Sequence, residues 1–230
     1  MSIQKIIGEI PARIGSERIK RKNLRDLAGK PLIQYAIDSA KNSTLLTDLY
    51  VNTESKLIGD YALKQSVKFY KRDEKLATND VRQDEFNYDF IKNTDADVLV
   101  LINPVAPLIT ATDIDGIITE HLDKGNTVTV TSLQQQLHSF CKGKAINFDV
   151  GVMLPRTQDI DCIDICTWGV CVWDAKLFIN QFEKYGYAVF FGKVGFYPLT
   201  FLKSIKISTE EEFQLVEAII EARSVNLIGM

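Results

Sequence analysis

The chain has 230 residues, of which 46% are hydrophobic and 25% are charged, and its formal net charge is -3. This composition is typical of a globular protein with a large core, and no apolar run approaches the roughly 18 residues of a membrane span. Proteins that bind nucleic acid broadly carry a basic surplus, which this chain lacks. We therefore expect a soluble protein with no membrane and no nucleic acid among its partners.

The N-terminal sequence MSIQKIIGEI contains only a short apolar run and lacks the cleavage site of a signal peptide. We therefore expect the protein to be cytoplasmic. Its four cysteines show no paired C-x-x-C spacing, so reduced thiols are favoured over a metal site.

The first half of the chain alternates between strand-like and helix-like patterns. Apolar runs predict strands, and apolar residues three or four positions apart predict helices. The predicted strands cover 3–10, 47–53, 67–72 and 97–103, and the helices between them cover 32–43, 55–66 and 84–94. This order predicts an α/β fold, namely a single-domain, Rossmann-like, mostly parallel sheet with helices on both faces.

The second half continues the alternation with one interruption. A helix over 111–125, stopped by Gly125, precedes a strand over 126–133. From 134 to 165 the periodicity weakens, which predicts a small irregular segment projecting from the sheet. Strands over 167–174 and 188–199 then flank a helix over 175–185. A last helix covers about 209–223, and the motif STEE predicts Ser208 as its N-cap.

A basic loop follows the first predicted strand. Residues 13–30 contain seven Lys or Arg but only two acids, Glu17 and Asp26. Parallel sheets bind ligands at the carboxyl ends of their strands, where this loop begins. The loop contains neither G-x-G-x-x-G nor the spacing of a P-loop. Cations and backbone N–H groups at this edge favour a polyphosphate ligand, with a solvated basic surface as the alternative.

The residue order in this loop resembles a known family. The stretch IPARIGSERIKRKNLRDLAGKPLIQYAIDSA is similar to the opening of the cytidylyltransferases that activate sialic acids and related nonulosonates as CMP-sugars. Further family elements are resembled by YKRDEKLAT (70–78), VLVLINPVAPLITATDID (98–115) and STEEEFQLVEAII (208–220). The resemblance implies a fold of the nucleotide-diphospho-sugar transferase type. It also implies attack of a sugar hydroxyl on the α-phosphate of CTP, with release of pyrophosphate.

The resemblance assigns roles residue by residue. Arg13 and Lys22 are the implied catalytic residues and hold the triphosphate, and Ser16 completes the phosphate cradle. Asn23 is expected to contact the nucleotide or the incoming hydroxyl, and Arg72 to lie beside the cytosine. A turn-forming role for Asn23 and a surface ion pair for Arg72 are the alternatives. The full implied nucleotide-binding set is Ala12, Arg13, Ser16, Lys22, Asn23, Arg72 and Asn103.

The resemblance also implies a sugar site and a dimer. PRTQD at 155–159 resembles a family element in which Arg156 and Gln158 are candidates to contact the sugar acid or a dimer partner. A guanidinium pairs bidentately with a carboxylate, although an ordinary surface arginine is equally expected. The projecting segment and FYPL (196–199) are expected at a homodimer contact. The expected partners are therefore CTP, a sugar acid and a second copy of the chain.

Several positions depart from the family pattern. Glu17 stands where the family has lysine, and apolar residues at 105, 106 and 109 replace polar ones. Lys206 and Ser208 stand where the family has two aspartates that hold a divalent ion. Mg²⁺ is the cofactor that the family implies, but an ammonium and a hydroxyl are not its usual ligands. No metal ligand is therefore predicted in this chain.

The sequence thus predicts a cytidylyltransferase-like protein that joins CTP to a nonulosonic or sialic-type sugar acid in surface-glycan precursor synthesis, as for lipopolysaccharide or capsule. The alternative is a catalytically impaired nucleotide- or sugar-binding homologue that acts as a partner or regulatory subunit. The missing aspartates favour that alternative. It is opposed by the retained residues Arg13, Ser16, Lys22, Asn23 and Arg72. A sugar-nucleotide-dependent glycosyltransferase is disfavoured because no D-x-D motif follows a predicted strand.

Overall fold

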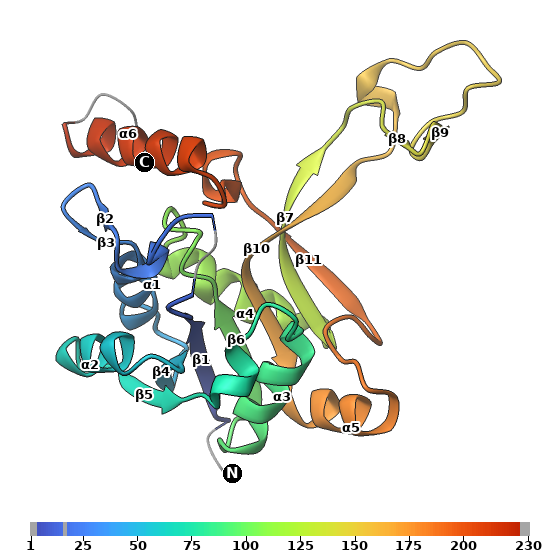
Figure 1. Ribbon diagram of the computed structural model, residues 1–230. Coiled ribbons are helices and arrows are strands. Elements are labelled where there is room, and N and C mark those ends of the chain that lie inside the picture. Colours follow the sequence, from blue (N-terminus) through green and yellow to red (C-terminus); the bar gives the residue numbers. More distant parts are fainter. Residues whose placement is uncertain (1–3, 16–17, 226–230) are drawn as a thin grey trace.

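A seven-stranded sheet lies at the centre of the molecule, with the strand order β11-β7-β10-β6-β1-β4-β5 (Figure 1). The computed structural model describes residues 4–15 and 18–225. β1 (Ile6–Pro11) lies between β4 (Asp48–Thr53) and β6 (Val98–Ile102) and is parallel to both, and β5 (Lys68–Lys71) pairs in parallel with β4. The predicted parallel α/β arrangement of the first half is confirmed.

The second half of the sheet is mixed. β11 (Val194–Pro198) runs parallel to β7 (Val128–Gln135), but β10 (Ile163–Asp174) is antiparallel to both β7 and β6. The reversal follows from the connection, because the chain leaves β7, turns back and returns as β10 without a crossover helix. The sheet is therefore mostly parallel, with one antiparallel strand inside it.

Helices cover both faces of the sheet, as predicted. On one face, apolar side chains of α1 (Leu32–Lys41), α2 (Lys56–Lys64) and α4 (Ala111–Lys124) form a core with β1, β4, β6 and β10. On the other face, α3 (Gln83–Lys92) and α5 (Ala175–Tyr185) form a second core. α4 ends where Gly125 adopts a φ of 57°, which confirms the predicted stop.

A third apolar cluster joins the basic loop to the last helix, α6 (Glu210–Ser224). Ile19 of the loop, Leu108 after β6 and the fully buried Ile207 meet Phe213 of α6 there. The backbone N–H of Ile207 also donates to the carbonyl oxygen of Val105 at 2.8 Å. The segment before α6 is therefore fixed against the loops at the carboxyl ends of β1 and β6.

The predicted cap of α6 is wrong by one residue. Thr209, not Ser208, is the N-cap, and its hydroxyl accepts from the Glu212 N–H at 3.2 Å. Both registers fit the capping-box pattern. In the observed register the Glu212 carboxylate accepts from the N–H groups of Ser208 at 2.6 Å and Thr209 at 2.8 Å, so one side chain satisfies two backbone donors.

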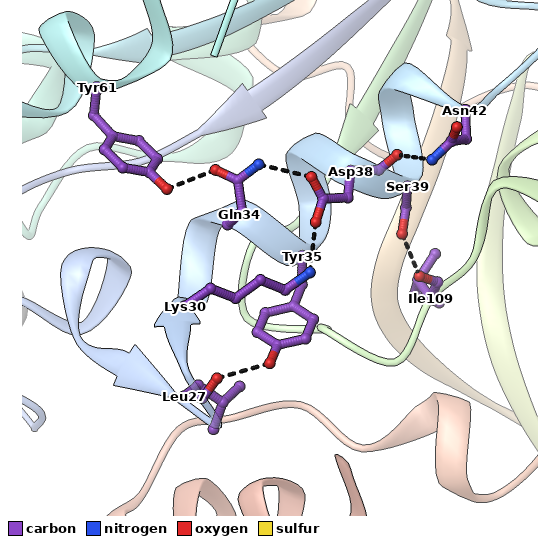
Figure 2. Close-up of polar contacts among 9 residues, drawn as sticks. All are labelled: Leu27, Lys30, Gln34, Tyr35, Asp38, Ser39, Asn42, Tyr61 and Ile109. Carbon is purple, nitrogen blue, oxygen red and sulfur yellow. Dashed lines mark hydrogen bonds and ion pairs between the residues drawn. The ribbon is translucent and has the colours of Figure 1, made fainter. Parts of the chain in front are cut away.

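Helix α1 anchors the end of the basic loop and the loop between β6 and α4 (Figure 2). The Tyr35 hydroxyl donates to the carbonyl oxygen of Leu27 at 2.7 Å, and the Ser39 hydroxyl donates to that of Ile109 at 2.7 Å. Leu27 belongs to β2 (Asp26–Leu27), which pairs with β3 (Lys30–Pro31) just before α1. The end of the basic loop is thereby fixed, as is the loop between β6 and α4.

An arm projects from the body between β7 and β10 (Figure 1). The predicted projection over 134–165 is confirmed, but its base is regular because Gln135 of β7 pairs with Ile163 of β10. Beyond that pair the arm holds only the short strands β8 (Phe140–Cys141) and β9 (Lys144–Ala145) and the 3-10 turn η3 (Thr157–Asp159). Nearer the body, β10 bulges at Trp168, whose φ is 57°.

The remaining regular elements are three short 3-10 turns, η1 (Lys22–Leu24), η2 (Glu74–Ala77) and η4 (Leu202–Ser204). Within the part of the chain that the structure describes, no helix has the length and apolar character needed to cross a membrane.

Candidate nucleotide-binding site

The predicted phosphate loop forms one wall of a pocket of about 200 Å³ at the carboxyl ends of β1 and β6. Arg13, Arg18 and Lys22 supply its cations. Its other lining residues are Pro11, Asn23, Asn103, Pro104 and Val105. The predicted residues Arg13, Lys22, Asn23 and Asn103 therefore lie together, and Arg18 joins them although it was not predicted. Ser16 and Glu17 lie outside the described residues.

Lys22 is the most constrained cation of this pocket. Its ammonium nitrogen, Nζ, donates to the carbonyl oxygen of Ile207 at 2.9 Å. Burial, followed by the nearby positive charges of Arg18, Lys206 and Arg13, lowers the pKa of Lys22 to about 8, against the opposing effect of Glu212. Crowded, partly buried cations of this kind favour an anionic ligand that relieves their repulsion.

Asn23 and Asn103 shape the same pocket from two loops. The Asn23 amide nitrogen donates to the carbonyl oxygen of Arg13 at 3.1 Å, so this side chain spans the loop rather than forming a local turn. Its oxygen, Oδ1, is buried and has no hydrogen-bond partner among the described residues. The Asn103 oxygen accepts from the N–H of Val105 at 3.3 Å and stabilises the turn after β6.

Ala12 has a structural position. Its side chain is buried in the core of the face that carries α1, and its N–H donates to the carbonyl oxygen of Asn52 at 3.0 Å. The predicted nucleotide contact of Ala12 is therefore limited to its backbone, at the point where β1 opens into the basic loop.

A second pocket, of about 180 Å³, adjoins the first through Arg13, which lines both. Arg72 and Phe86 lie in its wall, and the Arg72 guanidinium lies over the Phe86 ring, 4.5 Å from the ring centroid. Arg72 is only 4% exposed, so it is not the surface arginine of the alternative interpretation. The Arg13 guanidinium also donates to Asn79, which lines this pocket.

Two residues that sequence reasoning missed lie behind Arg72. Arg72 Nε donates to the Asn52 side-chain oxygen at 2.9 Å, and Nη2 donates to the Asn52 carbonyl oxygen at 3.0 Å. The Asn52 amide nitrogen donates to Glu9 Oε1 at 2.6 Å. Glu9 is fully buried, and burial raises its pKa to about 7 against the opposing effects of Arg72 and Asn52. The signal was a carboxylate inside the apolar strand IIGEIP.

A third pocket, of about 430 Å³, lies on the other side of the segment that Lys22 contacts. Lys206, Ser208 and Glu212 contribute its polar groups, and β7, β10 and α6 contribute Leu133, Ile165 and Leu215. The carbonyl oxygen of Ile207 accepts from Lys22, which lines the cationic pocket, and the neighbours of Ile207, Lys206 and Ser208, line the larger and more apolar pocket. This segment therefore forms the boundary between the two pockets.

The residues at this boundary do not fit a protein-held magnesium ion. Lys206 presents an ammonium close enough to Lys22 to lower its pKa. The Glu212 carboxylate already accepts from two backbone N–H groups. Within residues 4–15 and 18–225, no group of three His, Cys, Asp or Glu side chains is placed to hold a metal ion. Magnesium prefers a set of oxygen ligands, and this donor set does not supply one.

Arg156 and Gln158 are not brought to these pockets within the described chain. Both are exposed on the arm. Arg156 Nε donates to Asp159 Oδ2 at 2.7 Å, and the Gln158 carbonyl oxygen accepts from the Gln136 amide at 3.2 Å. The two predicted sugar contacts therefore stand apart from the cations of the basic loop.

Sequence comparison gives the family of the chain. Residues 7–146 match the family described as Cytidylyltransferase, so the chain belongs to the cytidylyltransferase family. The 3-deoxy-manno-octulosonate cytidylyltransferase of Bdellovibrio bacteriovorus is 40% identical over 111 residues, which is 48% of this chain and 43% of that protein. The chain thus spans less than half the length of that relative.

Two further proteins match over nearly their whole length. The post-translational flagellin modification protein B of Campylobacter coli is 23% identical over 240 residues, covering 96% of this chain and 97% of that protein. A CTP complex of CMP:2-keto-3-deoxy-manno-octonic acid synthetase superposes with a TM-score of 0.69 at 15% identity, covering 96% of this chain and 100% of that one. The structural likeness confirms the predicted fold.

Proposed function

We propose that the protein transfers the cytidylyl group of CTP to a hydroxyl group of a nonulosonic or sialic-type sugar acid, as a step in surface-glycan precursor synthesis. The observation that carries this proposal is the convergence of Arg13, Arg18 and Lys22 on one pocket, in a chain whose net charge is -3. That pocket continues through Arg13 into the pocket of Arg72 and Phe86. The two together suit the triphosphate and the base of one nucleotide.

The pocket of Arg72 and Phe86 is proposed to hold the cytosine. A pyrimidine ring can stack on an aromatic side chain, and Phe86 offers one in the pocket wall. Cytosine presents hydrogen-bond acceptors at O2 and N3, and the guanidinium of Arg72 carries only donors. Arg72 therefore has the chemistry to select this base, as the family resemblance implies.

The cationic pocket is proposed to hold the phosphates during the reaction. The sugar hydroxyl forms a bond from its oxygen to the α-phosphorus while the bond from that phosphorus to pyrophosphate breaks, and the hydroxyl proton is released. Charge on the phosphate oxygens is spread over the transferring group and the leaving group. Fixed cations such as Arg13 and Lys22 stabilise that charge without reorganising.

The sugar acid is proposed to occupy the third pocket, across the segment 206–208. Two of the relatives are named as cytidylyltransferases of acidic sugars, 3-deoxy-manno-octulosonate and N-acylneuraminate. An acidic sugar needs a cation, and Lys206 stands in the wall of that pocket. Arg156 and Gln158 on the arm are further candidates for the sugar carboxylate or for a dimer partner.

We also propose a homodimer formed through the arm and FYPL (196–199). The arm exposes several large apolar side chains that water solvates poorly, namely Leu137, Phe140, Ile146, Val150, Val152, Met153 and Leu154. Light scattering should give twice the chain mass. Met153→Glu, at a residue that is 93% exposed, should shift the protein toward a monomer. A monomeric wild-type protein would contradict this part of the proposal.

The impaired-homologue alternative draws support only from Lys206 and Ser208. Calorimetry with CTP, UTP and ATP separates binding from turnover. Arg13→Ala should weaken CTP binding at least about tenfold, because a charge-assisted contact is lost. Lys20→Ala is the matched control, since Lys20 belongs to the same loop but is exposed and does not line the pocket. Equal effects of the two variants, or no preference for CTP, would contradict the proposed nucleotide site.

A further inference from the structure

A buried carboxylate stands in the middle of the central sheet. Glu9 lies on β1, which is flanked by β4 and β6, and none of its surface is exposed. Burying an ionisable group costs free energy unless it is paired, and an aliphatic side chain at this position would avoid that cost. Glu9 therefore calls for an explanation beyond packing.

The contacts of Glu9 lead to the base pocket in two steps. Asn52 on β4 donates from its amide nitrogen to Glu9 Oε1 at 2.6 Å, and its amide oxygen accepts from Arg72 Nε at 2.9 Å. An amide has donors on one side and an acceptor on the other. Glu9 accepts from the Asn52 amide nitrogen and thereby fixes the orientation of the Asn52 side chain. The amide oxygen of Asn52 is then the group that faces Arg72.

Arg72 is held on further sides. Its Nη2 donates to the Asn52 carbonyl oxygen at 3.0 Å, and its guanidinium lies 4.5 Å from the centroid of the Phe86 ring. The charge of Glu9 also attracts the guanidinium, as do those of Glu54 and Asp89. A planar guanidinium that is fixed at two donors has little rotational freedom, so its remaining donors point in one direction.

We propose that Glu9 and Asn52 form a relay that orients Arg72 for recognition of the cytosine ring in the adjoining pocket. Glu9 is then a positioning residue, one layer behind the group that touches the base. The inference rests on the proposed function only in naming the ligand as cytosine. Because uracil carries a hydrogen at N3, a fixed donor at that position favours cytosine over uracil, and the relay sets base selectivity rather than phosphate affinity.

Calorimetry with CTP, UTP and inorganic tripolyphosphate tests the relay. Glu9→Val removes the acceptor, so CTP affinity should fall about tenfold or more and the preference over UTP should shrink, with tripolyphosphate affinity unchanged. Glu9→Gln keeps an acceptor oxygen for Asn52 and should stay within about threefold of wild type. Ile7→Ala is the control for general destabilisation, because Ile7 is buried on the same face of β1 two residues earlier.

A measurement without nucleotide separates the relay from the proposed function. Hydrogen exchange at Arg72 Nε, followed by nuclear magnetic resonance, should be slow in the wild type and Glu9→Gln and fast in Glu9→Val. If the wild type binds no CTP, the proposed function fails, and this exchange still decides whether Glu9 holds Arg72. The relay is overturned if exchange is unchanged in Glu9→Val, if Glu9→Val binds CTP like wild type, or if Ile7→Ala reproduces its selective loss.

Discussion

The ammonium nitrogen of Lys22 donates to the carbonyl oxygen of Ile207 at 2.9 Å, across 185 positions of sequence. The basic loop thereby contacts the segment that leads into α6. Lys206 and Ser208 lie on either side of Ile207 and line the third pocket, of about 430 Å³, while Lys22 lines the cationic pocket, of about 200 Å³. One hydrogen bond thus marks the boundary across which the proposed reaction brings sugar and phosphate together.

The lowered pKa of Lys22 predicts that nucleotide binding depends on pH. A base with a pKa of about 8 loses its charge as the pH rises through that value, so CTP affinity should decline between pH 7 and pH 9.5. The full loss is on the order of 1.5 to 3 kcal/mol for one charge-assisted contact. A bound phosphate would raise the pKa of Lys22 in the complex, so the decline should begin near the pKa of the free protein and end at the higher pKa of the complex. Calorimetry across this range measures it, and Lys22→Arg should be nearly flat. A flat wild-type profile would contradict the assignment.

Two substitutions should create a magnesium dependence that the residues present do not support. Lys206→Asp with Ser208→Asp replaces an ammonium and a hydroxyl by carboxylates, which are ligands that Mg²⁺ prefers. Thr209 remains the cap of α6, so the helix should keep its start. CTP affinity of the double variant should rise with Mg²⁺ and fall with a chelator. The wild type lacks these carboxylates, so its affinity should change by less than about threefold, which is under 1 kcal/mol. The same response in both proteins would contradict this prediction.

Glu9 should make the stability of the protein decrease as the pH rises toward neutrality. Burial raises its pKa from the ordinary value of 4.5 to about 7 in the fold, so between these values the folded chain holds a proton that the unfolded chain has released. This stabilisation is complete below about pH 4.5 and is lost as the pH rises through 7, on the order of 3 kcal/mol in all. The side chain of the Glu9→Gln variant does not ionise, so this variant lacks the pH-dependent stabilisation.

Urea unfolding at pH 5 and pH 8 measures this effect as a difference between two proteins. The free energy of unfolding of wild type relative to Glu9→Gln should be greater at pH 5 than at pH 8. Groups other than Glu9 titrate alike in both proteins and cancel. A constant difference between the two conditions would show that Glu9 does not titrate in this range.

The register of the α6 cap is open to a direct test. Thr209→Ala removes the side-chain acceptor for the Glu212 N–H and should lower the free energy of unfolding by about 1 kcal/mol. Ser208→Ala is the matched control and should cost less than about 0.5 kcal/mol, because the Ser208 contact to Glu212 uses its backbone N–H. Chemical denaturation distinguishes the two, and the opposite ranking would restore Ser208 as the cap.

Most of the fold could be predicted because its signals are local. Apolar periodicity and a single glycine sufficed for α4, which ends at Gly125 as expected. The direction of β10 relative to its neighbours could not be predicted from its own sequence, since an apolar run predicts a strand but not whether that strand pairs in parallel or antiparallel. The α6 cap was placed one residue early because STEE and TEEE both fit a capping box.

Part of the candidate site could likewise be predicted from the sequence, and part could not. Arg13, Lys22 and Asn103 follow strands that end at one edge of the sheet, so their convergence could be predicted. The contact between Glu9 and Asn52 could not, because it depends on the register in which β1 pairs with β4, 43 positions along the chain. The role of Lys206 likewise depends on how α6 folds back over the basic loop.

The central claim is cytidylyl transfer, and the most direct measurement is pyrophosphate release by the purified protein. The protein should be supplied with each nucleoside triphosphate and with a panel of sugar acids that includes N-acylneuraminate and 3-deoxy-manno-octulosonate, and the nucleotide product should be identified by mass. The proposal predicts pyrophosphate only when CTP and one of the sugar acids are both present, with a CMP-sugar formed in equal amount and little release by Arg13→Ala. CTP binding without any pyrophosphate release across the panel would contradict it and would favour the impaired homologue.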